Sequence, residues 1–122
     1  ILECLARRGH ARAQALLSSV MAASGDLIDA WAWRSVAAYA DPDAARMFLD
    51  SIALDMSAAQ LTTALKRADV LRAKYGADAT GLWCAANRRS DEVVNWQCHR
   101  TKGLPSAGSC VAESSVGAAD EQ

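Results

Sequence analysis

Three of the four cysteines, Cys84, Cys98 and Cys110, lie in the last third of the chain, and His99 lies among them. Cysteine and histidine side chains can bind zinc, and a thiolate activated by an imidazole can act as a catalytic nucleophile. Two thiols can instead join in a disulfide. The spacing of the residues along the chain distinguishes between these chemistries.

The spacing disfavours a zinc site. Structural zinc sites usually carry pairs such as C-x₂-C, because a short turn directs both thiolates at one ion. Here 13 residues separate Cys84 from Cys98, and 11 separate Cys98 from Cys110. His99 directly follows Cys98, a spacing that seldom lets both side chains reach one ion. We therefore predict no metal and no cofactor, and a site of these three cysteines with His99 is the weaker alternative.

A cysteine-dependent enzyme is also disfavoured. It would need a partner that stabilises the thiolate, and His10 and His99 are the only histidines of the chain. His10 falls in a turn between two expected helices. The sequence contains no G-x-S-x-G, P-loop or H-E-x-x-H motif. We predict no catalytic residue, and a thiol-dependent enzyme is the least favoured function.

Disulfide formation is the preferred interpretation of Cys84, Cys98 and Cys110. A Cys84–Cys98 bond would close a loop of 15 residues, which stabilises a fold by about 3 kcal/mol in the chain-entropy model. Cys98–Cys110 is nearly as plausible. Cys4 falls on a packed helix face and is predicted to be a buried thiol, unless it lies close enough to pair with the cysteine left over. The alternative is four reduced cysteines in a cytoplasmic protein.

Composition predicts a single helical domain. The chain has 122 residues, of which 52% are hydrophobic but only 6% aromatic, because much of the apolar content is alanine. With 13 basic and 14 acidic residues, it has no positive excess to neutralise phosphates, so we predict no nucleic-acid binding. No apolar run approaches the roughly 20 residues that span a bilayer.

Apolar periodicity predicts four antiparallel helices with short turns between them. Asp41 with Pro42 marks one helix start, and Ser57 with Gln60 forms a capping box at another. The first nine residues are typical of the end of a helix, so we expect the chain to be an excerpt from a longer protein. The four helices cover residues 10–24, 27–40, 41–56 and 57–75.

Beyond Gly76 the pattern becomes irregular. Residues 77–110 are predicted to be a cysteine-bearing extension that covers the last helix, anchored by Trp83 and Trp96. Within it, only residues 90–99 show a helical pattern, with Ser90 as the cap. Residues 111–122 are small and polar, and we predict that they are disordered.

A shift of 32 residues superimposes the helical pattern on itself, with Ala13 on Ala45 and Leu17 on Leu49. These helices resemble the SEL-one-like repeat (SLR) family, a branch of the tetratricopeptide superfamily. The matching residues follow its spacing of small and large side chains and are Ala30, Trp33, Ala37, Ala38, Ala45 and Leu49 in one copy and Ala6, Gly9, Ala13, Gln14 and Leu17 in the preceding copy.

The resemblance implies an all-α solenoid of antiparallel helix pairs over residues 1–76, with possible stacking on further repeats before it. Proteins of this family are typically non-enzymatic scaffolds that bind protein partners, many of them in bacterial envelopes or secretion systems. Together with the cysteines, this implies a periplasmic or secreted location. An immunity protein that inhibits a secreted toxin is the alternative function.

In such arrays the first helix of each pair lines the concave face. By the 32-residue register, Gln14 superimposes on Arg46 and Ser18 on Asp50, beside the apolar stripe. Solvated helix positions with no function are the alternative for each of them. The candidate partner-binding residues are Arg12, Gln14, Ser18, Asp43, Arg46 and Asp50.

Overall fold

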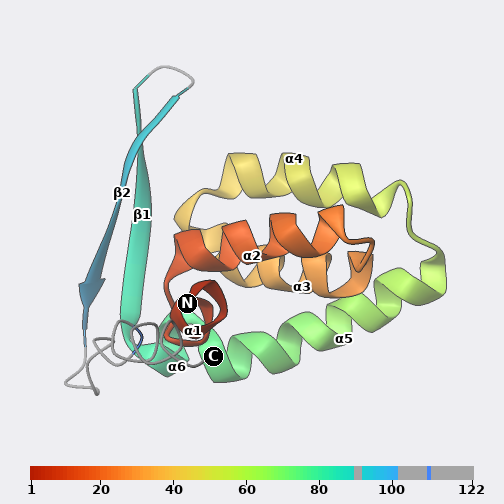
Figure 1. Ribbon diagram of the computed structural model, residues 1–122, viewed down its shortest axis with the longest axis horizontal. Coiled ribbons are helices and arrows are strands. Elements are labelled where there is room, and N and C mark those ends of the chain that lie inside the picture. The colour runs from red at the N-terminus through yellow and green to blue at the C-terminus, as the bar shows by residue number, and fades with distance from the viewer. Residues whose placement is uncertain (90–91, 102–109, 111–122) are drawn as a thin grey trace, which may run out of the picture.

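A layer of helices is followed by a two-stranded β-hairpin that projects from one end of the layer (Figure 1). The computed structural model describes residues 1–89, 92–101 and 110. The elements are α1 (Leu2–Arg7), α2 (Ala11–Ala23), α3 (Leu27–Ala37), the 3₁₀ helix η1 (Ala38–Ala40), α4 (Pro42–Ala53), α5 (Ala58–Tyr75), α6 (Ala77–Thr80), β1 (Leu82–Arg89) and β2 (Glu92–Arg100).

The helix starts lie where the capping residues predict them. The Asp26 carboxylate accepts a hydrogen bond from the Asp29 N–H at 3.2 Å, which satisfies a free donor in the first turn of α3. At the start of α5, the Ser57 and Gln60 side chains each accept a bond from the other's backbone N–H, at 3.1 and 2.8 Å. The predicted capping box is therefore confirmed.

The main core lies where α2, α3 and α5 meet. Trp33 is only 4% exposed and stacks on Tyr75, with the ring centroids 5.6 Å apart. The predicted core position of Trp33 is thus confirmed. Most other members are alanines, which let the helices approach closely. The buried cluster consists of Ala6, Ala13, Leu17, Ala32, Trp33, Val36, Ala68 and Leu71.

The structure does not show the predicted repeat. Ala13 and Ala45 are both buried, but Leu17 is buried while its counterpart Leu49 is half-exposed. Helices α4 and α5 both pack on α3 and diverge from one another beyond the turn that joins them (Figure 1). The described residues therefore form a bundle of antiparallel helices, and a solenoid is not shown.

Two predictions about the extension are wrong. The chain is not all-α, because β1 and β2 form an antiparallel sheet, and the stretch predicted to be helical up to His99 is a strand instead. Pairing across the hairpin places Cys84 opposite Cys98, and on that face Leu82, Cys84, Trp96 and Cys98 pack against the helices. The predicted cap Ser90 and the predicted disordered tail, 111–122, lie outside the described residues.

The hairpin also does not cover α5 as predicted. Its base packs on the start of α2 and the end of α3, with Trp96 half-buried against the cluster and Trp83 against Tyr39. The physical reason is that the inner face of the hairpin needs an apolar surface, which the small side chains there supply. The cluster consists of Ala11, Ala15, Ala37, Ala40, Leu82 and Cys84.

Two disulfides close the fold. The predicted bond between Cys84 and Cys98 is present and joins directly opposite residues of β1 and β2. Cys4, predicted to be a buried thiol unless it paired with the remaining cysteine, is bonded to Cys110. Cys110 therefore does not pair with Cys98. The bond fixes the fully buried Cys110 against α1, and none of the four cysteines is free.

The two disulfides are expected to differ in their contribution to stability. Cys4–Cys110 joins residues 106 positions apart, against 14 for Cys84–Cys98. In the chain-entropy model, C4A/C110A should lower the free energy of unfolding by about 4 to 5 kcal/mol and C84A/C98A by about 3 kcal/mol. Urea unfolding without reductant measures both. Free thiols in the wild-type protein, or a midpoint unchanged by reductant, would contradict the assignment.

Gly9 and Gly25 provide a matched pair for a second prediction. Both have positive φ, +93° and +92°, but a Cβ at Gly9 would collide with the Thr80 side chain, whereas one at Gly25 would meet nothing within 4 Å. Gly25→Ala should cost only the backbone term, about 1–2 kcal/mol. Gly9→Ala should cost clearly more in the same denaturation assay, because Thr80 must move as well. If both variants lost the same free energy of unfolding, the Thr80 side chain would be able to move aside at no cost.

Candidate functional site

A groove opens between α4 and α5, and we call it the α4 groove. It has a volume of about 300 Å³. It is open because α4 packs on α3 and η1, while α5 diverges from it. The side chains that line it include Trp31, Pro42, Arg46, Leu49, Asp50 and Leu61.

Two large apolar side chains of α4 and the residue after it are exposed, outside the lining of this groove. Met47 on α4 is 73% exposed, and Leu54, directly after α4, is 87% exposed. On the other side of the helix, the Arg34 guanidinium of α3 lies 4.8 Å from the centroid of the Phe48 ring, a cation–π contact that holds α4 in place. Helix α4 and the residue after it therefore carry two apolar side chains that the described residues leave uncovered, among charged ones.

Two of the candidate partner-binding residues, Arg46 and Asp50, line the α4 groove one helical turn apart. Asp43 lies beside them and accepts a bond from Arg46 at 3.5 Å, with both side chains more than 70% exposed. An ion pair so exposed contributes little stability, so both groups can exchange it for other partners. Arg12 is exposed on α2, and it is not among the residues that line the groove.

The other two candidates, Gln14 and Ser18, are corrected by the structure, because they are 1% and 0% exposed. The Gln14 amide donates to the carbonyl oxygens of Ala6 and Tyr75, at 3.0 and 2.9 Å. The Ser18 hydroxyl donates to the carbonyl oxygen of Ala30. These side chains tie α2 to α1, α3 and the end of α5, and buried positions cannot contact a partner in this fold.

A second, larger hollow of about 630 Å³ lies where the helices meet the hairpin, and we call it the hairpin groove. Sequence patterns did not indicate it, because its walls come from α3, η1, α5, α6 and β1. Its volume falls in the range usual for ligand sites. The polar and aromatic side chains that line it are Ser35, Tyr39, Asp69, Arg72, Asp78 and Trp83.

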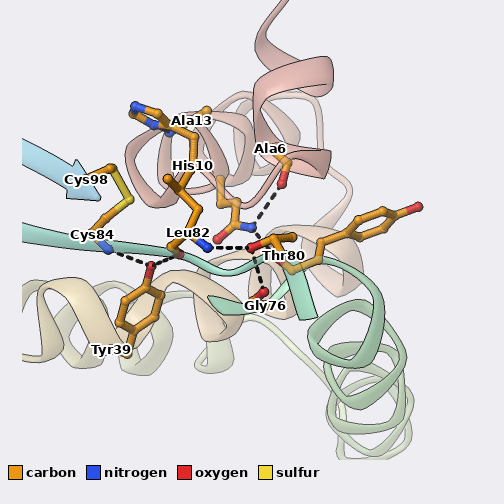
Figure 2. The surroundings of a disulfide bond; sticks show 11 residues. Ala6, His10, Ala13, Tyr39, Gly76, Thr80, Leu82, Cys84 and Cys98 are labelled. Carbon is orange, nitrogen blue, oxygen red and sulfur yellow. Dashed lines mark hydrogen bonds between the residues drawn. A yellow bond between two sulfur atoms is a disulfide. The ribbon is translucent and has the colours of Figure 1, made fainter. Parts of the chain in front are cut away.

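Tyr39 fixes the wall that the hairpin contributes (Figure 2). Its hydroxyl donates to the Leu82 carbonyl oxygen at 3.4 Å and accepts from the Cys84 N–H at 3.1 Å. Burial raises the pKa of Tyr39, and the bond from Cys84 opposes that shift. The Trp83 ring packs edge-on against Tyr39, with the centroids 5.3 Å apart. The aromatic wall is therefore held by the backbone of β1.

Thr80 holds the start of β1, next to the same wall (Figure 2). Its hydroxyl donates to the Gly76 carbonyl oxygen at 2.9 Å and accepts from the Leu82 N–H at 3.3 Å. Across the groove, the Arg72 guanidinium donates to the Ser35 hydroxyl at 2.9 Å and to the Asp69 carboxylate at 3.1 Å. Arg72 thus links Ser35 of α3 to Asp69 of α5 along this side of the groove.

The two histidines have different environments. His10 caps α2, where its Nδ1 accepts from the Ala13 N–H, and burial lowers the pKa of His10 with help from Arg12. His99 is exposed on β2. Over residues 1–89, 92–101 and 110, no three His, Cys, Asp or Glu side chains gather as metal ligands would.

Comparison of the chain with protein-family models, with curated proteins and with solved structures finds no match. The resemblance to the SLR family therefore stays a prediction. The function must be argued from the two grooves and the surfaces beside them.

Tyr39→Phe tests the anchor of the hairpin. It removes one hydroxyl and leaves the Cys84 N–H without that acceptor, so the free energy of unfolding should fall by about 1–3 kcal/mol. Tyr75→Phe is the matched control, because the Tyr75 ring stacks on Trp33 and no hydrogen bond of its hydroxyl occurs within the described part of the chain. Equal stability of the two variants, measured by urea unfolding, would contradict the anchoring role.

Proposed function

We propose that the chain is a non-enzymatic binding module that holds a protein partner in the α4 groove. The observation that carries this proposal is an apolar groove with Arg46 and Asp50 among the residues that line it, on a helix that also exposes Met47. Contiguous exposed apolar surface with a charged rim is typical of protein-binding sites.

The shape of the groove favours an amphipathic helix as the bound segment. Leu49 of α4 and Leu61 at the start of α5 both line the groove, and the half-buried Trp31 adds an aromatic anchor of the kind that dominates binding energy. An apolar helix face would cover these side chains. Arg46 and Asp50, opposite in charge and one turn apart, would fix the direction of that helix.

Two disulfides suit an oxidising compartment, because cytoplasmic thiols are kept reduced. In the part of the chain that the structure describes, no helix is both long and apolar enough to cross a bilayer. We therefore place the module in the periplasm or outside the cell, where envelope and secretion assemblies would supply a partner.

Charge reversal at Arg46 tests the proposed function. Arg46→Glu should weaken binding of a purified partner about tenfold or more, because it replaces an attraction at the groove wall by a repulsion. The melting temperature should stay unchanged, since the Arg46 side chain is 73% exposed. The partner is first found by cross-linking in cells, and its affinity is then measured by calorimetry.

Lys74→Glu is the control, because Lys74 is exposed near the far end of α5 and carries the same charge. It should bind the partner as the wild type does. Joint loss of affinity and of melting temperature in Arg46→Glu would assign Arg46 a structural role. Unchanged affinity would exclude the α4 groove as the binding site.

A further inference from the structure

The β-hairpin has two unlike faces. Its inner face carries Leu82, Cys84, Trp96 and Cys98, which are buried or half-buried against the helices. The outer face carries the alternate side chains, and those described at positions 83, 85, 87, 95, 97 and 99 are exposed. In register across the two strands, the outer-face pairs are Trp83 with His99, Ala85 with Gln97, and Asn87 with Asn95.

Three side-chain amides form a connected row on the outer face. The Asn87 amide nitrogen donates to the side-chain oxygen of Asn95 at 2.7 Å and to that of Gln97 at 3.4 Å. These bonds use both hydrogens of the Asn87 amide and orient the other two groups. The oxygen of Asn87 and the NH₂ groups of Asn95 and Gln97 retain capacity for further bonds. The row therefore offers donors and acceptors without net charge.

Trp83 joins this row to the hairpin groove. It lies on the outer face, 37% exposed, and it also lines the groove. Its contact with Tyr39, whose hydroxyl is bonded to β1, holds the ring in place. On the outer face, Trp83 and Asn87 are about 14 Å apart at the usual rise of a strand. One continuous surface thus runs from the groove along the hairpin.

In the hairpin groove, which Trp83 also lines, Arg72 offers hydrogen-bond donors and Asp69 offers acceptors. The Arg72 guanidinium uses one N–H for Ser35 and one for Asp69, and three of its five N–H groups remain. The Asp69 carboxylate is 81% exposed and can accept further bonds. A guanidinium beside a carboxylate matches two neighbouring hydroxyl groups, each of which both donates and accepts.

We propose that this surface, from Asp69 and Arg72 past Trp83 to the amide row, binds a neutral glycan. A sugar ring has an apolar face of C–H groups that can stack on an indole, and hydroxyls at its edge that amides recognise. The proposal is independent of the α4 groove. It assigns Trp83 as the stacking platform and the amides as the groups that select hydroxyls.

Other ligand classes fit this surface less well. None of the six outer-face residues named above is Asp, Glu, Lys or Arg, so the amide row offers an anionic ligand no counter-charge, and in the groove the charge of Arg72 is offset by Asp69 beside it. An apolar peptide would cover the amides and leave their donors unpaired, which costs about 1–3 kcal/mol for each group. A neutral, polyhydroxylated chain satisfies both the ring and the amides.

Titration calorimetry of the purified chain with cellohexaose and chitohexaose, and with heparin as an anionic comparison, tests the proposal. At least one neutral hexasaccharide should bind with a Kd in the millimolar range or tighter. Trp83→Ala and Asn87→Ala/Asn95→Ala should each weaken it about tenfold or more. Arg46→Glu, in the α4 groove, should bind sugar as the wild type does.

Gln97→Ala separates the loss of a sugar contact from a general loss of structure. It removes one exposed amide and leaves Trp83 and its contact with Tyr39 intact. It should weaken sugar binding by a few fold at an unchanged melting temperature. The proposal is overturned if neither hexasaccharide binds, if heparin binds more tightly, or if the Trp83 and amide variants bind as the wild type does. None of these results would bear on the partner of the α4 groove.

Discussion

Close approach of helices through alanine is the constraint from which the rest of the structure follows. Ala13, Ala32 and Ala68 are buried between α2, α3 and α5, and their small size brings the backbones together. At that distance the Gln14 and Ser18 side chains reach the carbonyl oxygens of neighbouring elements. A larger side chain at these contacts would separate the helices and break those bonds, so packing and polar satisfaction depend on the same short distances.

The hairpin is stable because its base packs on the helical layer. An isolated two-stranded sheet is marginally stable in water, and this one has only a few apolar side chains on its inner face. Its stability comes from the alanines it covers, from the Cys84–Cys98 bond and from the Tyr39 hydroxyl. Those contacts are concentrated at the base, so the outer face is free to carry polar groups such as Asn87 and Asn95.

Local signals in the sequence predicted the helices well and the hairpin poorly. Caps such as Ser57 with Gln60 act within one turn, so they mark a helix start whatever surrounds it. In the extension, Ser90 and the acidic residues after it suggested a helix. Yet Val94, Trp96 and Cys98 alternate with polar residues in the period of a strand, a signal that could have identified β2.

Arg46 and Asp50 of the α4 groove were candidates from the 32-residue register of the sequence, and the Cys84–Cys98 bond was predicted from the short spacing of its cysteines. The hairpin groove and the pairing of Cys4 with Cys110 depend on contacts between distant segments, which spacing does not encode. That pairing makes the chain from residue 4 to residue 110 a covalent ring. Tension applied to the chain on either side of the ring would pass through the sulfur atoms rather than through the helices. The segment is thereby shielded from pulling forces, and a single cut in its backbone would not separate the pieces.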